Sequence, residues 1–312
     1  MRNFHQPVML GEVIHYLQPK AGDNFIDCTL GGGGHTEELL KRIAPSGKVL
    51  GIDLDPLAIQ TTQEAIKNHK GRLIIAKGNF SDLAQIVKEN KFTKVKGILL
   101  DLGLSSGQLR DHNRGFSFLA EGSLDMRFGA QSETTAETII NSCSPKALIE
   151  IFKNFGEESL AKPIVDQIVY VRKKTPITKP AQLVEIVCEV YKKYYRAKSK
   201  FNPATKVFQA LRIAVNEELQ NLTAVLPAAM NILQKNGRLV VISYHSLEDR
   251  TVKEFFATQS RDCICPPKMP LCQCTHKKSL KIITKKPISA TDLEILENPR
   301  ARSAKIRVAQ KI

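Results

Sequence analysis

The sequence contains no long apolar run. No stretch approaches the roughly 18–20 apolar residues that a membrane-spanning helix needs, so a helical membrane protein is excluded. The first residues, Met1 to Pro7, also lack the apolar core of a secretory signal peptide. The expected location is therefore the cytoplasm, with no membrane partner.

A disulfide framework is also missing. The chain has seven cysteines, an odd number, and three of them, Cys28, Cys143 and Cys188, are scattered through core-like segments. Such cysteines are typical of reduced thiols in a reducing compartment. Internal repeats and low-complexity tracts are absent too, and 42% hydrophobic with 25% charged residues is an ordinary composition for a globular protein.

Acidic residues are in short supply. The chain has 31 Asp and Glu against 46 Lys and Arg, which gives a net charge of +15. Such an excess favours a polyanionic partner, although in many proteins a basic balance serves solubility alone. Its distribution favours RNA, because the segment 191–200 mixes cations with tyrosines. Cations follow phosphates and aromatic rings stack on unpaired bases, so we expect RNA contacts from Tyr194, Lys198 and Lys200.

Four consecutive glycines, Gly31 to Gly34, follow a short apolar run at 24–27 that is typical of a buried strand. Residues 37–43 then have helical spacing, with acids in the first turn. Glycine allows the backbone to approach a ligand closely, and the free N–H groups of a helix start point at it. The stretch therefore predicts a nucleotide-like site; the competing interpretation is a flexible turn.

A second predicted strand, 47–53, ends in acid. An acid about 20 residues beyond the glycines is placed to accept hydrogen bonds from ribose hydroxyls. Asp55 precedes a proline and is the expected N-cap of the next helix, which leaves Asp53 for the ribose. The third glycine of the dinucleotide fingerprint is missing, since Thr36 or Glu37 stands there. S-adenosylmethionine (SAM) has no pyrophosphate to cradle and tolerates this loss, and Asp27 suits its cationic amino group.

Strands alternate with helices through the first hundred residues, and further strands follow at 237–243, 280–284 and 303–308. This order predicts an α/β fold with a doubly wound, mostly parallel sheet of seven strands, as in class I SAM methyltransferases. Ligands bind at the carboxyl ends of such strands. Four candidate residues fall there: Asp27, Asp53, Phe80 and Asp101.

Little strand signal remains between about 109 and 204, where helical spacing dominates. We expect a SAM-binding domain at 1–108 and 205–312, and a helical insertion at 109–204 that recognises RNA. Asn202 and Pro203 predict the start of one long helix whose buried stripe reaches Leu226. Beside that stripe lie Arg212 and Asn216, which are candidate RNA contacts or simply solvated surface.

Over nearly its full length the chain resembles the MraW-type rRNA small-subunit methyltransferases. The matching stretches are 5–10, 31–36, 52–56, 98–106, 114–118, 124–127, 208–213, 245–250 and 298–303. The resemblance implies SAM-dependent methylation of the N4 amine of a cytidine in the decoding centre of 16S rRNA (position 1402 in that rRNA). The implied partner is 16S rRNA or the small ribosomal subunit, either free or assembled, and the enzyme is a monomer or a homodimer.

By matched position, the resemblance also implies a set of SAM contacts: Gly33, Gly34, His35, Asp53, Phe80, Asp101 and Gln108. Candidates for accepting the amine proton are Asp101 at the end of the fourth strand, His245 at the end of the fifth, and Asp125 in a matched stretch. Two bland interpretations compete, in which His245 is a helix-start histidine and Phe80 is core. The chain departs from the family at Asn202, Lys206 and Tyr244, where histidine, arginine and phenylalanine are usual.

Two other functions are consistent with parts of the sequence. One is a nucleotide-dependent oxidoreductase, against which the missing third glycine argues. The other is a non-catalytic RNA-binding assembly factor that retains a methyltransferase fold. Radiolabelled methyl transfer to small-subunit particles distinguishes the factor from the enzyme.

One constellation stays outside the predicted site. Cys263, Cys265, Cys272 and Cys274 lie in a short stretch with three prolines between the pairs. Four thiols can bind zinc, but the usual ligand spacing is C-x₂₋₄-C, and C-x-C is tighter. A structural metal and a reduced, ordered loop both remain open, and the expected reaction needs no metal.

Overall fold

The computed structural model describes residues 7–69, 71–105, 107–108, 111, 113–118, 121–129, 133–195, 202–266, 269 and 271–312. The chain forms two compact units. Unit 1 comprises Met1–Gly103 and Leu219–Ile312, and unit 2 comprises Leu104–Glu218. Each unit has its own hydrophobic core.

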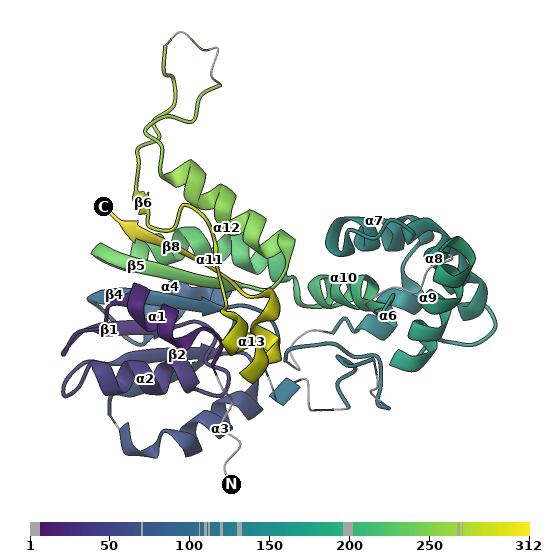
Figure 1. Ribbon diagram of the computed structural model, residues 1–312, viewed down its shortest axis with the longest axis horizontal. Coiled ribbons are helices and arrows are strands. Elements are labelled where there is room, and N and C mark those ends of the chain that lie inside the picture. Colours follow the sequence, from purple (N-terminus) through teal and green to yellow (C-terminus); the bar gives the residue numbers. More distant parts are fainter. Residues whose placement is uncertain are drawn as a thin grey trace. The chain divides into compact units, whose positions relative to one another are not determined.

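Unit 1 is built on one sheet with the order β3-β2-β1-β4-β5-β8-β6, and a short β7 pairs with β8 (Figure 1). The strands are β1 (Asn24–Asp27), β2 (Val49–Asp53), β3 (Leu73–Lys77), β4 (Val95–Asp101), β5 (Leu233–Ser243), β6 (Leu280–Ile282), β7 (Ile288–Ser289) and β8 (Lys305–Lys311). Strands β1 to β5 pair in parallel, and β8 is antiparallel to β5, β6 and β7. The predicted fold class is confirmed, and β7 is the one strand that was not expected.

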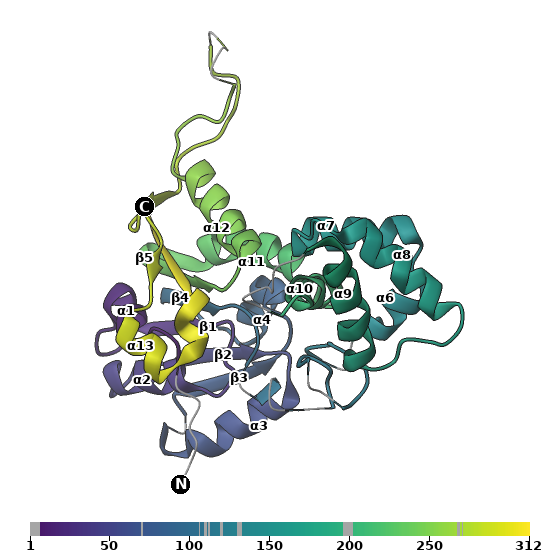
Figure 2. The ribbon, with the colours of Figure 1, turned by 45° about the vertical axis from the view of Figure 1, so that its right-hand side comes forward.

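Helices cover both faces of this sheet (Figures 1 and 2). One face packs against α4 (Leu83–Glu89), α11 (Glu218–Ile232) and α12 (Ser246–Gln259). The other packs against α1 (Leu10–Leu17), α2 (Gly34–Arg42) and the end of α3 (Pro56–Ala65), together with the 3₁₀ turn η3 (Pro299–Ser303). Because both faces are covered, the central strands β2 and β4 are buried along most of their length rather than at every second residue. The remaining short elements are α13 (Asp292–Glu297), η1 (Lys67–His69) and η2 (Phe80–Asp82).

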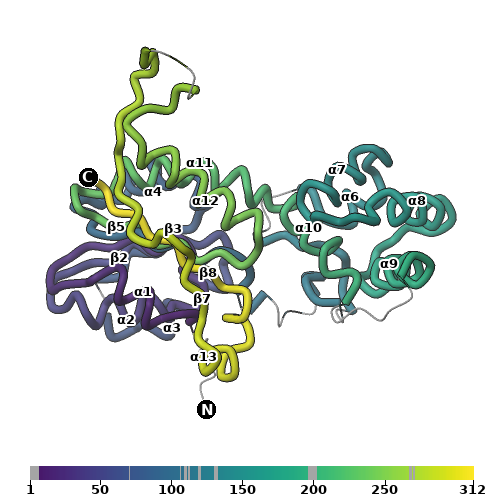
Figure 3. The backbone as a smooth tube through the Cα atoms, turned by 45° about the horizontal axis from the view of Figure 1, so that its top comes forward, coloured from purple at the N-terminus to yellow at the C-terminus, as the bar shows by residue number. Residues whose placement is uncertain are grey.

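Between α12 and β6 the chain leaves the sheet and returns in a long excursion, residues 260–279. It extends away from the end of α12 in all three views (Figures 1, 2 and 3). Within the described residues it contains no helix or strand before β6. The four clustered cysteines lie in this excursion.

Unit 2 is a bundle of helices, labelled on the right of Figure 1. They are α6 (Ala136–Ser142), α7 (Pro145–Gly156), α8 (Ala161–Arg172), α9 (Pro180–Tyr194) and α10 (Thr205–Asn216). Leu148, Phe152, Ile164, Leu183 and Leu211 are among its fully buried residues. No helix in the described part of the chain is both long and apolar enough to cross a membrane.

The expectation of one long helix after Asn202 is wrong. The structure has two helices, α10 and α11, and between them Glu217 takes a left-handed conformation with φ of 50°. The end of the helical insertion was expected between residues 204 and 205, whereas the two compact units divide between Glu218 and Leu219. The physical reason is that Phe208 and Leu211 of α10 belong to the helical core, with α7 beside them.

Candidate active site

Three acids lie at the same edge of the sheet in unit 1. Asp27, Asp53 and Asp101 end β1, β2 and β4, which are adjacent parallel strands. Parallel neighbours end on the same side, so the three carboxyl groups and the glycine loop after β1 share one edge, where open α/β sheets bind ligands. The sequence predicted this edge as the site.

The glycine loop needs glycine both for its backbone conformation and for its close packing against α3. Gly31 and Gly33 have φ of 49° and 78°, a region that side chains avoid. A Cβ on Gly33 would lie 2.7 Å from Thr62 Cγ2 of α3, and the Thr62 hydroxyl donates to the Gly31 carbonyl at 2.8 Å. Helix α2 begins at Gly34, so its first N–H groups open onto the sheet edge.

Asp53 holds the loop and remains able to bind a ligand. Oδ2 accepts the Gly31 N–H at 2.8 Å, and Oδ1 accepts the Asp55 N–H at 2.8 Å. A carboxylate has about four lone-pair sites, so two are left for donors such as ribose hydroxyls. Burial raises the pKa of Asp53 to about 6, against the two backbone hydrogen bonds that lower it. Asp55 accepts from the Leu57 N–H as the N-cap of α3, as predicted; the role of Asp53 toward ribose stays a prediction.

Asp27 is fully inside the protein. Thr36 donates its hydroxyl to Oδ2 at 2.7 Å, and the Thr29 N–H donates to Oδ1 at 3.1 Å. The side chain is buried, and that burial raises its pKa, opposed chiefly by the charge interaction with His35. Asp27 therefore braces the loop from within, and its contact with a ligand's amino group stays a prediction.

Asp101 lies between an imidazole and a phenol. The Tyr244 hydroxyl donates to Oδ1 at 2.7 Å, and His35 Nδ1 lies 3.8 Å from Oδ2. Burial raises the pKa of Asp101, while His35 and the Tyr244 hydrogen bond act against the rise. Burial and the carboxylate together raise the pKa of Tyr244, so the phenol stays protonated. One oxygen of Asp101 is thus occupied, and the other is held near a histidine.

The hydrogen bond of His35 fixes which nitrogen faces Asp101 as an acceptor. Nε2 lies 3.0 Å from the Val8 carbonyl, which can only accept. Nε2 therefore carries a proton, and in the neutral ring Nδ1 is the bare nitrogen that faces Oδ2 of Asp101.

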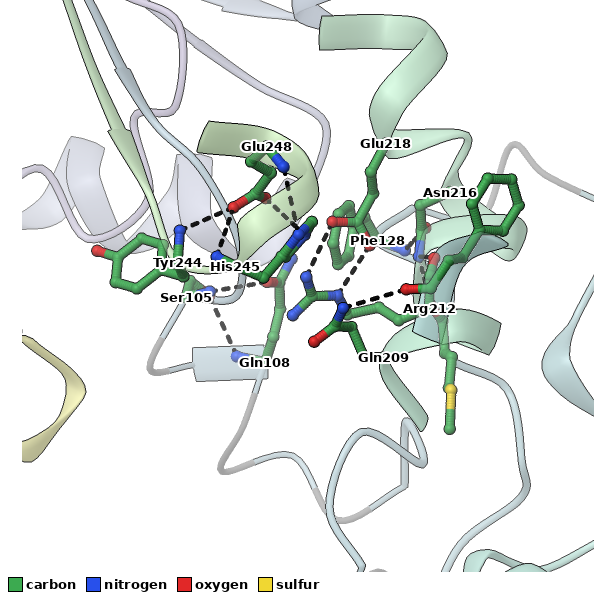
Figure 4. Close-up of polar contacts among 12 residues, drawn as sticks. Ser105, Gln108, Phe128, Gln209, Arg212, Asn216, Glu218, Tyr244, His245 and Glu248 are labelled. Carbon is green, nitrogen blue, oxygen red and sulfur yellow. Dashed lines mark hydrogen bonds and ion pairs between the residues drawn. The ribbon is translucent and has the colours of Figure 1, made fainter. Parts of the chain in front are cut away.

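His245 is the N-cap of α12, as the bland interpretation held (Figure 4). Nδ1 accepts the Glu248 N–H at 3.4 Å, and Glu248 in turn accepts the Tyr244 N–H at 2.8 Å. The proton of the neutral ring is then on Nε2, 3.2 Å from Glu248 Oε1. Nε2 is buried and has no aligned hydrogen-bond partner within the described residues. In this arrangement His245 has a donor at Nε2. If Nδ1 accepted a proton, the N-cap hydrogen bond from the Glu248 N–H would be lost.

Phe80 begins η2, directly after β3. It is half-buried and packs against the core that includes α4. Its backbone follows the carboxyl end of β3, which pairs with β2 in the sheet. Packing on a ligand's adenine and packing in the core are therefore both available to this side chain.

Two predicted residues belong to unit 2. Gln108 is buried, and its Oε1 accepts the Ser105 N–H at 2.9 Å (Figure 4). Asp125 forms a two-pronged ion pair with Arg127, at 2.7 and 2.8 Å. Burial alone would raise the pKa of Asp125, but the hydrogen bonds and charge of Arg127 outweigh it and lower the pKa. A carboxylate held in this way is a weak base.

The polar stripe of α10 makes contacts within unit 2 (Figure 4). Arg212 binds Glu218 through two nitrogens, at 2.8 and 3.0 Å. Asn216 accepts the Phe128 N–H at 2.7 Å and donates to the Met126 carbonyl at 2.8 Å. Tyr194, at the end of α9, is 60% exposed and available to stack. Lys198 and Lys200 lie outside the described residues.

Tyr244 is the residue whose part in the site the sequence did not reveal. It stood out only as a departure from the family's phenylalanine. A signal was present, because Tyr244 follows β5 directly and β5 pairs with β4, whose Asp101 lies opposite Ile242. A hydroxyl added two residues further on, at the same sheet edge, can reach the carboxyl group that ends the neighbouring strand.

Comparison with known proteins gives one family over the whole chain. A family model described as the MraW methylase family matches residues 2–312. A relative from Thermomicrobium roseum is 46% identical over 99% of this chain and 94% of its own length. A second, from Trichlorobacter lovleyi, is 43% identical over 100% of both chains, and a third, from Halothermothrix orenii, is 44% identical over 99% and 98%. All three are named ribosomal RNA small subunit methyltransferase H.

Proposed function

Since this chain belongs to the MraW methylase family and is a SAM-dependent methyltransferase, we propose that it methylates small-subunit rRNA at the N4 amine of a cytidine. The named relatives support rRNA as the substrate class. The N4 position and the decoding-centre cytidine come from the family resemblance. The reaction would take place in the cytoplasm, on the rRNA or on the small subunit that contains it.

The observation that carries the proposal is the sheet edge of unit 1. A glycine loop, the start of α2 and the carboxyl groups of Asp53 and Asp101 meet there. These groups suit a nucleoside that carries a charged substituent, because they supply acceptors for the ribose hydroxyls and a backbone that the ligand can approach closely. Asp53 fits the ribose because it keeps unused lone pairs beside the Gly31 N–H that it already binds.

SAM supplies an activated methyl group on a positively charged sulfur. The amine of cytosine is a poor nucleophile, because its lone pair is conjugated into the ring. The protein must therefore align nitrogen, methyl and sulfur, and alignment of this kind can supply about 7–11 kcal/mol. Asp53, the glycine loop and Phe80 would fix the nucleoside part, so that the methyl group is presented in one direction.

We assign the amine proton to Asp101 rather than to His245 or Asp125. Asp101 has one oxygen that is not bonded to Tyr244, and its pKa is raised, which makes it the better base. His245 uses its acceptor nitrogen to cap α12, and the pKa of Asp125 is lowered.

Unit 2 would hold the flanking RNA. The end of α9 carries exposed Lys192, Lys193, Tyr194 and Tyr195, which combine phosphate-binding and stacking groups. Displacing the target base from its stack costs a few kcal/mol, and such contacts would repay it. Arg212 and Asn216, engaged within unit 2, would act by shaping this unit unless RNA displaces their partners.

Methyl transfer to ribosomal particles tests the proposal. Small subunits from a strain that lacks this methylation are incubated with the protein and methyl-labelled SAM, and the rRNA is digested to nucleosides. Mass spectrometry is expected to find N4-methylcytidine, and Asp53→Ala is expected to abolish most of the signal. A methylated base other than N4-methylcytidine would overturn the position, and no transfer with intact SAM binding would favour a non-catalytic assembly factor.

A further inference from the structure

The excursion between α12 and β6 brings four cysteines together. Its base is closed where the Ser279 N–H donates to the Gln259 carbonyl at 3.0 Å and the Ser279 hydroxyl bonds the Gln259 side chain at 2.9 Å. Cys263 and Cys265 lie on the outgoing arm, and Cys272 and Cys274 lie on the returning arm. The four Sγ atoms all lie within 4.8 Å of one another.

Two of the six sulfur–sulfur separations match those around a tetrahedral metal, and the others are within 4.8 Å. Cys272 Sγ and Cys274 Sγ are 3.6 Å apart, and Cys274 Sγ and Cys263 Sγ are 3.7 Å apart. Four sulfurs at about 2.3 Å from a zinc ion stand about 3.8 Å from each other at tetrahedral angles. A disulfide needs about 2.05 Å, and all four cysteines are free. The tight C-x-C spacing therefore does not prevent a tetrahedral arrangement here.

Backbone groups also point at the sulfurs. The Ile264 N–H donates to Cys274 Sγ across the two arms, and the Cys265 N–H donates to Cys263 Sγ, both at 3.4 Å. Hydrogen bonds to ligand atoms orient them and disperse their negative charge. The cross-arm bond is informative, because it fixes one pair against the other.

Apolar packing does not explain why the arms meet. The large hydrophobic side chains of the excursion face solvent: Ile264 is 47% exposed, Met269 39% and Leu271 78%. A segment without a core of its own usually needs a covalent or metal crosslink to hold one shape. The only described groups that converge between the arms and could make such a link are the four thiols.

We propose that Cys263, Cys265, Cys272 and Cys274 bind one Zn²⁺ ion as a closed, structural tetrathiolate site. Four protein ligands leave no open position for water or substrate, so the ion holds the fold of the excursion and takes no part in methyl transfer. Binding converts four thiols to thiolates and releases their protons. The site then carries a net charge of about −2, next to the basic Arg261, Lys277 and Lys278.

Metal content of the purified full-length protein is the first test. Protein prepared under reducing conditions from zinc-supplemented cells is expected to contain one zinc per chain by elemental analysis. The double variant Cys272→Ser/Cys274→Ser is expected to contain none. Cys188→Ser, a change of the same kind in α9 of unit 2, is the matched control and is expected to keep the zinc.

Cobalt substitution tests the ligand set without relying on one variant's folding. The Co²⁺ form of the wild-type protein is expected to show the strong visible bands of a tetrahedral site and thiolate-to-cobalt charge transfer. Each single Cys→Ser change among the four is expected to weaken the charge-transfer band, and unchanged circular dichroism and SAM affinity would show that unit 1 is folded.

Three results would overturn the proposal. Wild-type protein with neither zinc nor a cobalt spectrum would indicate a reduced, metal-free loop. A mass lower by two hydrogens per bond, with no metal, would indicate disulfides. Iron in place of zinc would replace the ion proposed. None of these readouts depends on methyl transfer, so the zinc site and the proposed function stand or fall separately.

Discussion

At the scale of single residues, the site depends on buried carboxyl groups whose pKa values are raised by burial. Asp53 is the clearest case, because its raised pKa of about 6 comes from burial and is opposed by hydrogen bonds from Gly31 and Asp55. A ribose diol donates stronger hydrogen bonds to the charged carboxylate than to the protonated acid, which also has fewer acceptor sites. Ligand binding and proton loss from Asp53 are therefore coupled.

SAM affinity is expected to depend on pH through the ionisation of Asp53. SAM favours the ionised form, so its affinity is expected to be constant above about pH 7 and to fall below the pKa of about 6, by up to tenfold per pH unit. Calorimetry between pH 7.5 and 5 measures this. Asp27 and Asp101 also have raised pKa values, so the Asp53→Asn variant is the control. It is expected to bind about 10- to 100-fold more weakly and to lose most of the pH dependence. Equal pH dependence in both proteins would remove Asp53 from the coupling.

Tyr244 gives a second test at this scale. Tyr244→Phe removes the hydrogen bond to Asp101 that keeps the carboxyl pKa from rising further. The acid limb of the rate–pH profile is therefore expected to move to higher pH, while SAM affinity at pH 8 changes little. The family resemblance implies phenylalanine at this position, so the variant is expected to fold.

The matched control for Tyr244→Phe is Tyr170→Phe, which removes an exposed hydroxyl in unit 2. An acid limb that stays in place in Tyr244→Phe would show that Asp101 does not set the rate in this pH range. A shift of equal size in both variants would show that the effect is not local to Asp101.

At the scale of elements, the glycine loop is held by packing against α3. Gly33→Ala is expected to lower the free energy of unfolding, because φ of 78° costs a side chain about 1–2 kcal/mol and the new Cβ would lie 2.7 Å from Thr62. Urea denaturation measures the change. Gly11→Ala is the opposite control, since a Cβ there meets nothing within 4 Å and the residue lies in α1. Equal stability of the two variants would contradict the packing argument.

The helices and strands differ in how well the sequence alone predicts them. The strand from Val95 to Asp101 was predicted with its observed bounds, because its apolar run Ile98 to Leu100 is buried and ends in a polar group. The break at Glu217 was missed, because glutamate is a good helix former and its left-handed conformation has no local signature. Asp53 could be predicted from spacing, whereas the Tyr244–Asp101 bond joins residues 143 positions apart and depends on the register of β5 against β4.

At the scale of the whole molecule, the net charge of +15 favours RNA binding, and the number of phosphates that the protein neutralises sets how that binding responds to salt. Each phosphate neutralised on a single strand contributes about 0.7 to the slope of log affinity against log salt. The exposed pair Lys192 and Lys193 ends α9 beside Tyr194. If both bind phosphates, Lys192→Ala/Lys193→Ala lowers the slope by up to about 1.4.

Fluorescence anisotropy with a labelled decoding-centre RNA, over a series of salt concentrations, measures that slope. Lys67→Ala/Lys88→Ala removes the same charge from exposed positions of unit 1 and is expected to leave the slope nearly unchanged. Tyr194→Ala, by contrast, is expected to weaken binding by about 1–3 kcal/mol at every salt concentration, since stacking is not an ionic contact. An equal loss of slope in the two lysine pairs would mean that the net charge, and not the end of α9, attracts the RNA.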